Sequence, residues 1–104
     1  MKKILVYWRD IPAQVLVQRG RDRGKAILSH RFQAAIDRAA MRAGKGGSKE
    51  YMEDWRRESN AFEGTGSLQE HAQSIAAEIE TQFSDDDIKR LIKNKGLRPS
   101  EKQK

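Results

Sequence analysis

Hydrophobic positions are densest near the start of the chain, in two runs separated by the hexapeptide RDIPAQ. The runs Lys3 to Arg9 and Gln14 to Arg19 are rich in Val, Ile, Leu, Tyr and Trp, which favour strands. Because Pro12 cannot donate a ladder hydrogen bond, we place it in the connection between the two strands. Both faces of the first strand are apolar, so we expect it to be central or covered on both sides.

The polar segment QRGRDRGK, residues 18–25, is interpreted as a connection. Apolar residues at helical spacing follow it. From about Lys25 to Ala43 the apolar residues recur every three or four positions and form one stripe. The glycines of GKGG, residues 44–47, are typical of a helix end. A short helix is predicted over residues 48–57. Residues 58–66 are either a third, edge strand or a loop, and we favour the strand.

Two further helices are predicted in the second half of the chain. Ser67 and Glu70 match the capping-box pattern, and an apolar stripe continues to about Gln82. The acids of SDDD, residues 84–87, suit the positive end of the next helix, which Gly96 ends. The pattern predicts an α+β fold in which a small antiparallel sheet, a hairpin with a third edge strand, packs against three to four helices. It forms one domain over residues 3–96, followed by a polar, flexible tail over residues 97–104.

The composition removes several classes of function. The chain has 104 residues and no cysteine, which excludes disulfides, thiolate metal sites and cysteine nucleophiles. The apolar run after the two N-terminal lysines is too short for a signal peptide, and no run is long enough to span a membrane. We therefore expect a soluble, cytoplasmic protein. The two histidines, His30 and His71, lie on predicted helices without the spacing of a metal pair, so we expect no metal, cofactor or catalytic residue.

The net charge of +6 is unevenly distributed. Residues 58–88 contain 8 acids and no Lys or Arg, while the segments on either side are basic. Such an arrangement allows internal charge complementarity. The high net charge alone is therefore weak evidence for a polyanionic partner.

Two aromatic and arginine clusters, YWRD and DWRR, are typical of protein interfaces and of surfaces that stack bases. Core packing is the alternative for each tryptophan. The cluster residues and a basic rim on the first helix are the predicted partner-binding set: Trp8, Arg9, Asp10, Arg38, Arg42, Trp55, Arg56 and Arg57.

Four cations also gather between the second strand and the first predicted helix. They form the predicted anion-binding set: Arg19, Arg21, Arg23 and Lys25. A helix start attracts anions, although the segment lacks the spacing of a Walker loop. A solvated surface loop is the alternative.

The blocks VYWRDIPAQVLVQRGR, RFQAAIDRAAMRAG and YMEDWRR resemble the virulence factor domain of bacterial proteins, over roughly residues 3–92. That domain occurs in standalone alphaproteobacterial proteins and, fused to helical repeats, in a conserved virulence factor of Gram-positive bacteria. The resemblance implies a compact accessory domain. It also suggests a link with corrinoid and folate one-carbon metabolism or with virulence-associated regulation.

We therefore expect a non-enzymatic accessory domain that binds a larger cytoplasmic protein. The alternative is a module that binds RNA or DNA through its basic N-terminal half, with an affinity that falls steeply with salt. The sequence leaves the oligomeric state open.

Overall fold

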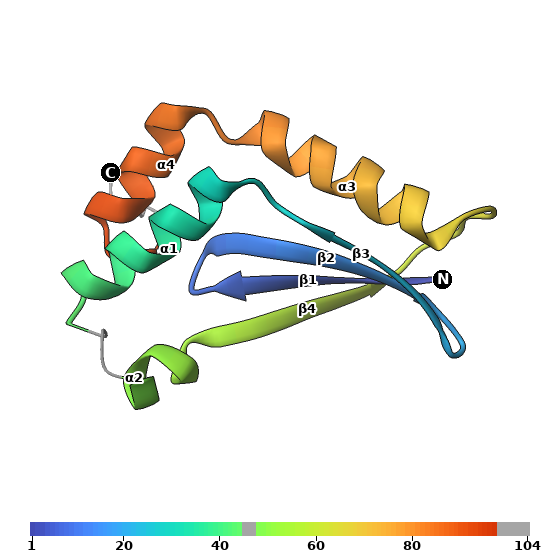
Figure 1. Ribbon diagram of the computed structural model, residues 1–104, viewed down its shortest axis with the longest axis horizontal. Helices are drawn as coiled ribbons and strands as arrows, with labels where there is room; N and C mark the ends of the chain where they lie inside the picture. The colour runs from blue at the N-terminus through green and yellow to red at the C-terminus, as the bar shows by residue number, and fades with distance from the viewer. Residues whose placement is uncertain (45–47, 98–104) are drawn as a thin grey trace, which may run out of the picture.

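The computed structural model describes residues 1–44 and 48–97, except for the side chains of Ser48 and Glu50. It contains a four-stranded antiparallel sheet and four helices (Figure 1). In chain order the elements are β1 Lys2–Trp8, β2 Ile11–Arg19, β3 Asp22–Ile27, α1 His30–Arg42, α2 Ser48–Glu53, β4 Trp55–Ala61, α3 Leu68–Gln82 and α4 Asp85–Lys93. The strand order is β3-β2-β1-β4, so β3 and β4 form the two edges. The predicted α+β class is confirmed.

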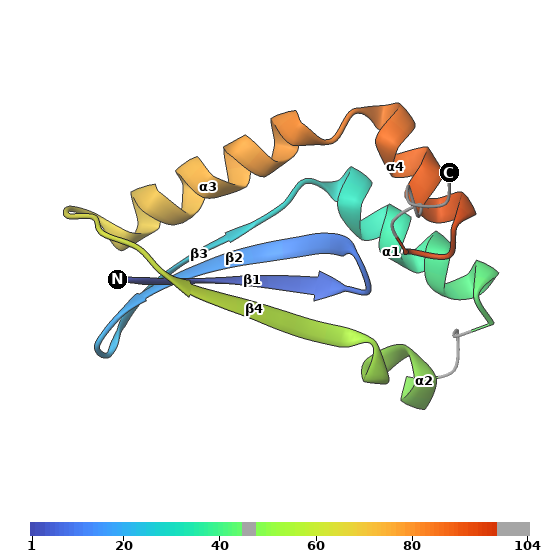
Figure 2. The same cartoon turned by 180° about the vertical axis from the view of Figure 1, so that it is seen from behind.

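The long helices lie on one side of the sheet, with α3 along β2 and β3 and with α1 and α4 beyond one end of the strands (Figures 1 and 2). The main core forms where apolar residues of β2 meet the stripes of these helices. Its members include Val15 and Val17 of β2, Phe32 and Ile36 of α1, Ala72 and Ile79 of α3, and Ile88 and Leu91 of α4. None of the described helices combines the length and the apolar character that a membrane crossing requires.

Gly24 lets α3 approach the sheet closely. A Cβ atom at this position would lie 2.5 Å from the backbone carbonyl carbon and oxygen of Leu68, closer than packed atoms approach. The position is buried, on the helix side of β3. The first turn of α3 therefore rests directly on the backbone of this strand.

The first hairpin is tighter than predicted. β1 and β2 are joined by Arg9 and Asp10 alone, and Pro12 lies inside β2, so its placement in the connection was wrong. The register changes between Val6 and Tyr7, which marks a bulge, one of the places where a strand accepts proline. Arg9 takes a left-handed backbone conformation, φ 55°, which a two-residue turn requires.

We predicted that residues 18–25 form a connection, but they form the turn and the adjoining strand ends of a second hairpin. β3 occupies residues 22–27 and pairs with β2, with Gly20 and Arg21 in the turn. The predicted start of the first helix at Lys25 was also wrong, because the helix begins at His30 with Ser29 at its cap. The last three residues of β3 were assigned to the first helix, but pairing with β2 places them in a strand.

The third predicted strand exists as an edge strand, but it begins earlier than predicted. α2 ends at Glu53, and the residues assigned to its second half form the start of β4, which pairs with β1. At α3, Ser67 accepts the Glu70 backbone N–H as predicted. The reciprocal capping box is found instead at α4, between Ser84 and Asp87. Of the predicted tail, only Leu97 lies within the described residues.

Candidate functional site

The side of the sheet that faces away from the helices carries its own small apolar cluster. Ile4, Val6 and Leu16 form this cluster, with Trp55 packed against it, and no helix residue belongs to it. β1 is therefore central in the sheet, but only one of its faces is covered by helices. We call this uncovered side the open face.

The strand register defines the rest of the open face. Val6 lies opposite Gln14 and Arg57, Ile4 lies opposite Leu16 and Ser59, and Lys2 lies opposite Gln18 and Ala61. From β3 the register adds Arg23, Lys25 and Ile27. With Trp55, which extends the β4 row, these thirteen positions include four cations, Lys2, Arg23, Lys25 and Arg57, and no carboxylate.

The cations of the open face are exposed, and none of the ion pairs found in the described part of the chain involves them. Ile27 is exposed as well, at 69% of its surface. In contrast, the 8 acids of residues 58–88 belong to the helix-side position of β4, to the loop before α3, and to α3 and α4. The open face is thus cationic, while the acids of residues 58–88 lie elsewhere in the fold.

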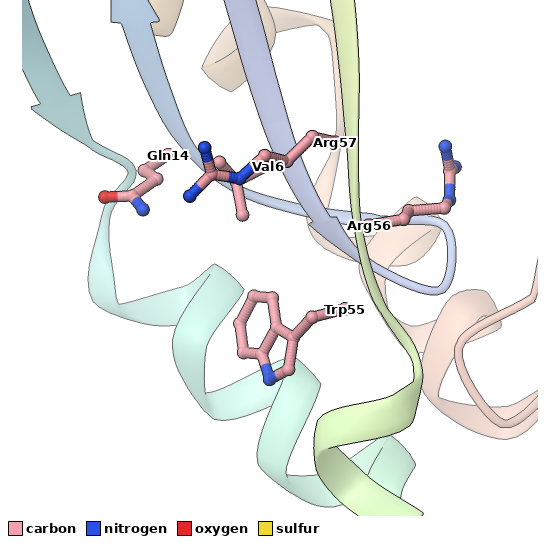
Figure 3. A pocket seen from close by; sticks show the side chains of 5 residues that line it. All are labelled: Val6, Gln14, Trp55, Arg56 and Arg57. Atoms are coloured by element: carbon pink, nitrogen blue, oxygen red, sulfur yellow. The ribbon is translucent and has the colours of Figure 1, made fainter.

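A hollow of about 590 Å³ opens at one end of the open face, lined by Val6, Gln14, Trp55, Arg56 and Arg57. Figure 3 shows the side chains of Arg57 and Arg56 leaving β4 in opposite directions. Arg57 extends towards Val6 and Gln14, while Arg56 contributes mainly its backbone. Trp55 is half-buried at the end of the hollow. An apolar ring beside an unpaired guanidinium can bind a side chain or a chain segment that combines apolar and acidic character.

Trp8 lies in the core and not in this hollow. It is fully buried, and its Nε1–H donates to the carbonyl oxygen of Tyr51 at 2.9 Å. Its ring stacks on Tyr51 with the centroids 5.9 Å apart. Of the two tryptophans in the predicted partner-binding set, only Trp55 has solvent-accessible surface.

The two aromatic and arginine clusters bind each other by reciprocal ion pairs. The Nε of Arg9 lies 3.2 Å from a carboxylate oxygen of Asp54, and the Nη2 of Arg56 lies 3.1 Å from one of Asp10. Arg9 also donates to the Lys95 carbonyl at 2.9 Å, which connects the hairpin to the end of α4. These pairs join the turn between β1 and β2 to the start of β4.

Arg56 has further contacts that hold it in place. Its Nε donates to the Arg9 carbonyl at 2.7 Å, its Nη1 pairs with Glu58, and its guanidinium lies 4.3 Å from the centroid of the Tyr7 ring. Partial burial acts to lower the pKa of Arg56, but the carboxylates of Glu58 and Asp10 outweigh it and raise the pKa. Three of the predicted binding residues, Arg9, Asp10 and Arg56, are thus engaged within the fold.

The predicted anion-binding cations are not gathered at a helix start, because β3 separates them from α1. Arg21 lies in the turn of the second hairpin, and Arg19 lies at the end of β2 opposite Asp22. Arg23 and Lys25 project onto the open face. The two remaining predicted residues, Arg38 and Arg42, are exposed on α1.

Neither histidine is part of a cluster with other ligands. His71 lies 2.7 Å, through Nε2, from the Thr65 carbonyl oxygen and packs edge-on against Phe62, while His30 is exposed. Within residues 1–44 and 48–97 no group of three His, Asp or Glu residues is placed to hold a metal ion.

Sequence reasoning missed several open-face residues, namely Lys2, Gln14 and Ile27. A signal was present in RGKAI, residues 23–27, where large side chains alternate with Gly24 and Ala26. That alternation is typical of a strand whose small residues lie under a helix. The prediction divided this segment between the connection, residues 18–25, and the first helix, which was expected from about Lys25, and so missed the strand.

Comparison with known proteins gives one match. A family model described as "Virulence factor" matches residues 6–92 of the chain. No curated protein and no solved structure matches it significantly.

Proposed function

This chain belongs to the virulence factor family, and on that premise we propose that it is an interaction domain whose open face binds a protein partner. The partner surface would offer carboxylates and apolar side chains. The predicted setting, an accessory domain beside a larger cytoplasmic protein with a role in one-carbon metabolism or virulence-associated regulation, is part of this proposal.

One observation carries the proposal. Four cations without an ion pair among the described residues and the half-buried Trp55 share a sheet face without a carboxylate among its thirteen positions, although the chain holds 15 acids. Surface cations normally have acids of the same molecule nearby, which reduces their attraction for an outside anion. Here the attraction remains available for a partner, and electrostatic complementarity of this kind speeds and directs association.

The test compares two charge reversals. Arg57→Glu changes a cation of the open face, and Arg21→Glu makes the same change in the exposed turn of the second hairpin. We expect a pull-down from the native host at moderate salt to recover a stoichiometric protein with the wild-type chain and with Arg21→Glu. Recovery should fall about tenfold or more with Arg57→Glu, since losing a charge-assisted hydrogen bond and adding repulsion costs well over 1.4 kcal/mol. Equal recovery with Arg57→Glu would contradict the proposal.

A second candidate function is the binding of single-stranded nucleic acid. The combination of an aromatic ring with four cations on a sheet favours it, because bases stack on aromatic rings and phosphates attract cations. The apolar cluster favours a protein partner instead. Apart from Trp55, the cluster consists of the aliphatic residues Ile4, Val6 and Leu16, which do not stack with bases. A shift of mixed RNA at low salt, lost in Arg57→Glu but kept in Arg21→Glu, would favour this second candidate.

A further inference from the structure

The outer edge of β4 has backbone hydrogen-bonding groups for which residues 1–44 and 48–97 offer no strand partner. β4 pairs with β1 on one side and ends the sheet on the other. The N–H of Arg9 donates to the carbonyl of Asp54, and the N–H of Phe62 donates to the carbonyl of Met1, both at 3.0 Å. Alternate residues of an antiparallel strand point their backbone groups the same way. The even-numbered residues from 54 to 62 therefore bond to β1, and the odd-numbered residues direct their N–H and C=O outwards.

The outward-directed residues are also residues of the open face. Arg57 lies opposite Val6, and Ser59 lies opposite Ile4, so both side chains share the face of the apolar cluster. Trp55 packs against the same cluster. A strand that added to this edge would bond to the backbone of Trp55, Arg57, Ser59 and Ala61. The side chains it placed opposite them would lie on the open face.

The opposite edge of the sheet is covered by a helix side chain at Lys25. The amide of the Gln69 side chain accepts the Lys25 N–H at 3.0 Å and donates to the Lys25 carbonyl at 2.8 Å. α3 thus satisfies the outward backbone groups of one β3 residue, Lys25, as a neighbouring strand would. Within the described part of the chain, no contact of this kind protects the outer side of β4.

The size of the open face favours a chain segment over a globular surface. Four strands spaced about 4.8 Å apart and seven residues of about 3.3 Å each cover a plane of roughly 440 Å². A standard protein interface buries about 800 Å² on each partner. An extended segment gains backbone hydrogen bonds as well as side-chain contacts, so it can bind a small face.

We propose that β4 takes up an extended acidic segment of a partner protein as a fifth, antiparallel strand. The segment alternates, with carboxylates opposite Arg57 and Ser59 and an apolar side chain opposite Trp55. This inference rests on the proposed function and specifies how the open face would bind.

A second copy of this chain is a poorer occupant of the edge. When two copies of one strand pair antiparallel about a two-fold axis, the residue on the axis lies opposite itself. At the middle of β4 that residue is Arg57, Glu58 or Ser59, and in the first two of these registers like charges would lie directly opposite each other, which is destabilising.

The test uses proline as a probe of the outer edge. In Ser59→Pro the lost N–H is one that points to solvent, so the fold should tolerate the change, as edge strands do. Ser59→Ala keeps the N–H and is the matched control. The ligand is a fluorescein-labelled peptide, Val-Thr-Glu-Thr-Glu-Thr-Leu, whose second glutamate would lie opposite Arg57. A second form of the peptide is N-methylated at that glutamate, and a control form at the threonine after it, whose N–H would face away from β4.

Fluorescence anisotropy should show binding to the wild-type chain and to Ser59→Ala. Ser59→Pro and the first methylated peptide should each lose about tenfold in affinity, since each removes at least one backbone hydrogen bond. Circular dichroism confirms that Ser59→Pro is folded, and the methylated peptides test the neighbouring backbone bond, to the Arg57 carbonyl, on the unaltered protein.

Four outcomes would overturn the inference. In the first, Ser59→Pro binds the peptide as tightly as the wild type does and the first methylated peptide binds as tightly as the unmodified one, while Arg57→Glu loses affinity. This result excludes strand addition but is consistent with the proposed function. Absence of peptide binding at low salt removes strand addition, and the pull-down then decides the proposed function separately. A dimer in sedimentation that Ser59→Pro abolishes assigns the edge to a second copy. Displacement of the peptide by single-stranded RNA at lower concentration than by unlabelled peptide assigns the face to nucleic acid.

Discussion

Trp8 and Trp55 lie directly opposite each other across β1 and β4, but only Trp55 keeps part of its side chain accessible. The ring of Tyr51 contacts both, stacked on Trp8 at 5.9 Å and edge-on to Trp55 at 5.8 Å. Trp8 is thus a buried member of the main core, whereas the partly accessible Trp55 packs against both the main core and the open-face cluster. The two tryptophans should respond differently to substitution.

Trp8→Ala should lower the free energy of unfolding by about 3–5 kcal/mol, because it empties a fully buried site and leaves the Tyr51 carbonyl without its indole donor. Trp55→Ala should cost about 1–2 kcal/mol, since the ring is only half-buried, yet it should weaken partner binding. Urea unfolding of both variants, with the pull-down on Trp55→Ala, checks this. Equal losses of stability would mean that Trp55 also belongs to the core.

Gly24→Ala should destabilise the fold by about 1–3 kcal/mol, as overpacking does, because the new Cβ would meet the backbone of Leu68 at 2.5 Å. Neither the strand nor the first turn of α3 can move aside as a flexible side chain would. Thermal unfolding measures the effect. Lys25→Ala, on the next residue of the same strand but on the open face, is the control and should stay within about 0.5 kcal/mol of the wild type.

Arg9 and Asp54 should show measurable energetic coupling. Their side chains are 15% and 26% exposed, so the pair is shielded more than a typical surface ion pair. A double-mutant cycle with Arg9→Ala and Asp54→Ala should give a coupling energy of about 1 kcal/mol. Arg9→Ala combined with Arg38→Ala serves as the comparison, because Arg38 is exposed on α1 and no hydrogen bond or ion pair within the described residues joins it to Arg9. A coupling near zero for Arg9 and Asp54 would show that the pair adds no stability.

Stability should fall in acid partly through Glu80, which connects the end of α3 to the start of α1. Burial acts to raise the pKa of Glu80, but hydrogen bonds from the Ser29 N–H and hydroxyl and the Arg31 guanidinium outweigh it and lower the pKa below its usual 4.5. A carboxylate with a lowered pKa in the fold stabilises above its unfolded pKa, and the stabilisation is lost as the pH falls through the folded pKa.

Glu80→Gln should therefore be less stable than the wild type at neutral pH, by about 1 kcal/mol, and the difference should shrink below pH 4.5. Urea unfolding across this pH range provides the measurement. Glu78→Gln, an exposed glutamate of the same helix, should change the free energy of unfolding little. A difference between the Glu80 variant and the wild type that stayed constant down to low pH would contradict the assignment.

The helices of the second half of the chain could be predicted closely from sequence. Ser67 and Ser84 precede apolar stripes, and a cap followed by helical spacing depends only on residues a few positions apart. The same held for the existence of β1 and β2, whose β-branched and aromatic content is a local signal.

The second hairpin could not be predicted in the same way. Residues 22–27 carry arginines, a lysine and a glycine, and they form a strand because β2 offers a partner and α3 covers Gly24. The start of β4 at Trp55 is likewise decided by pairing with β1 and by the ion pairs of Asp54 and Arg56. Pairing across the chain overrode the local preference in both segments.

By itself, then, the sequence determined the α+β class, the apolar stripes of the helices, and the alternation of basic and acidic segments, because each depends on neighbouring residues. The tertiary structure decided which side chains remain available for binding. It enclosed Trp8, paired Arg9 with Asp54 and Arg56 with Asp10, and placed Arg57 and Trp55 on an uncovered sheet face. Burial and ion pairing are set by residues far apart in the chain, so no local pattern could have told these arginines apart.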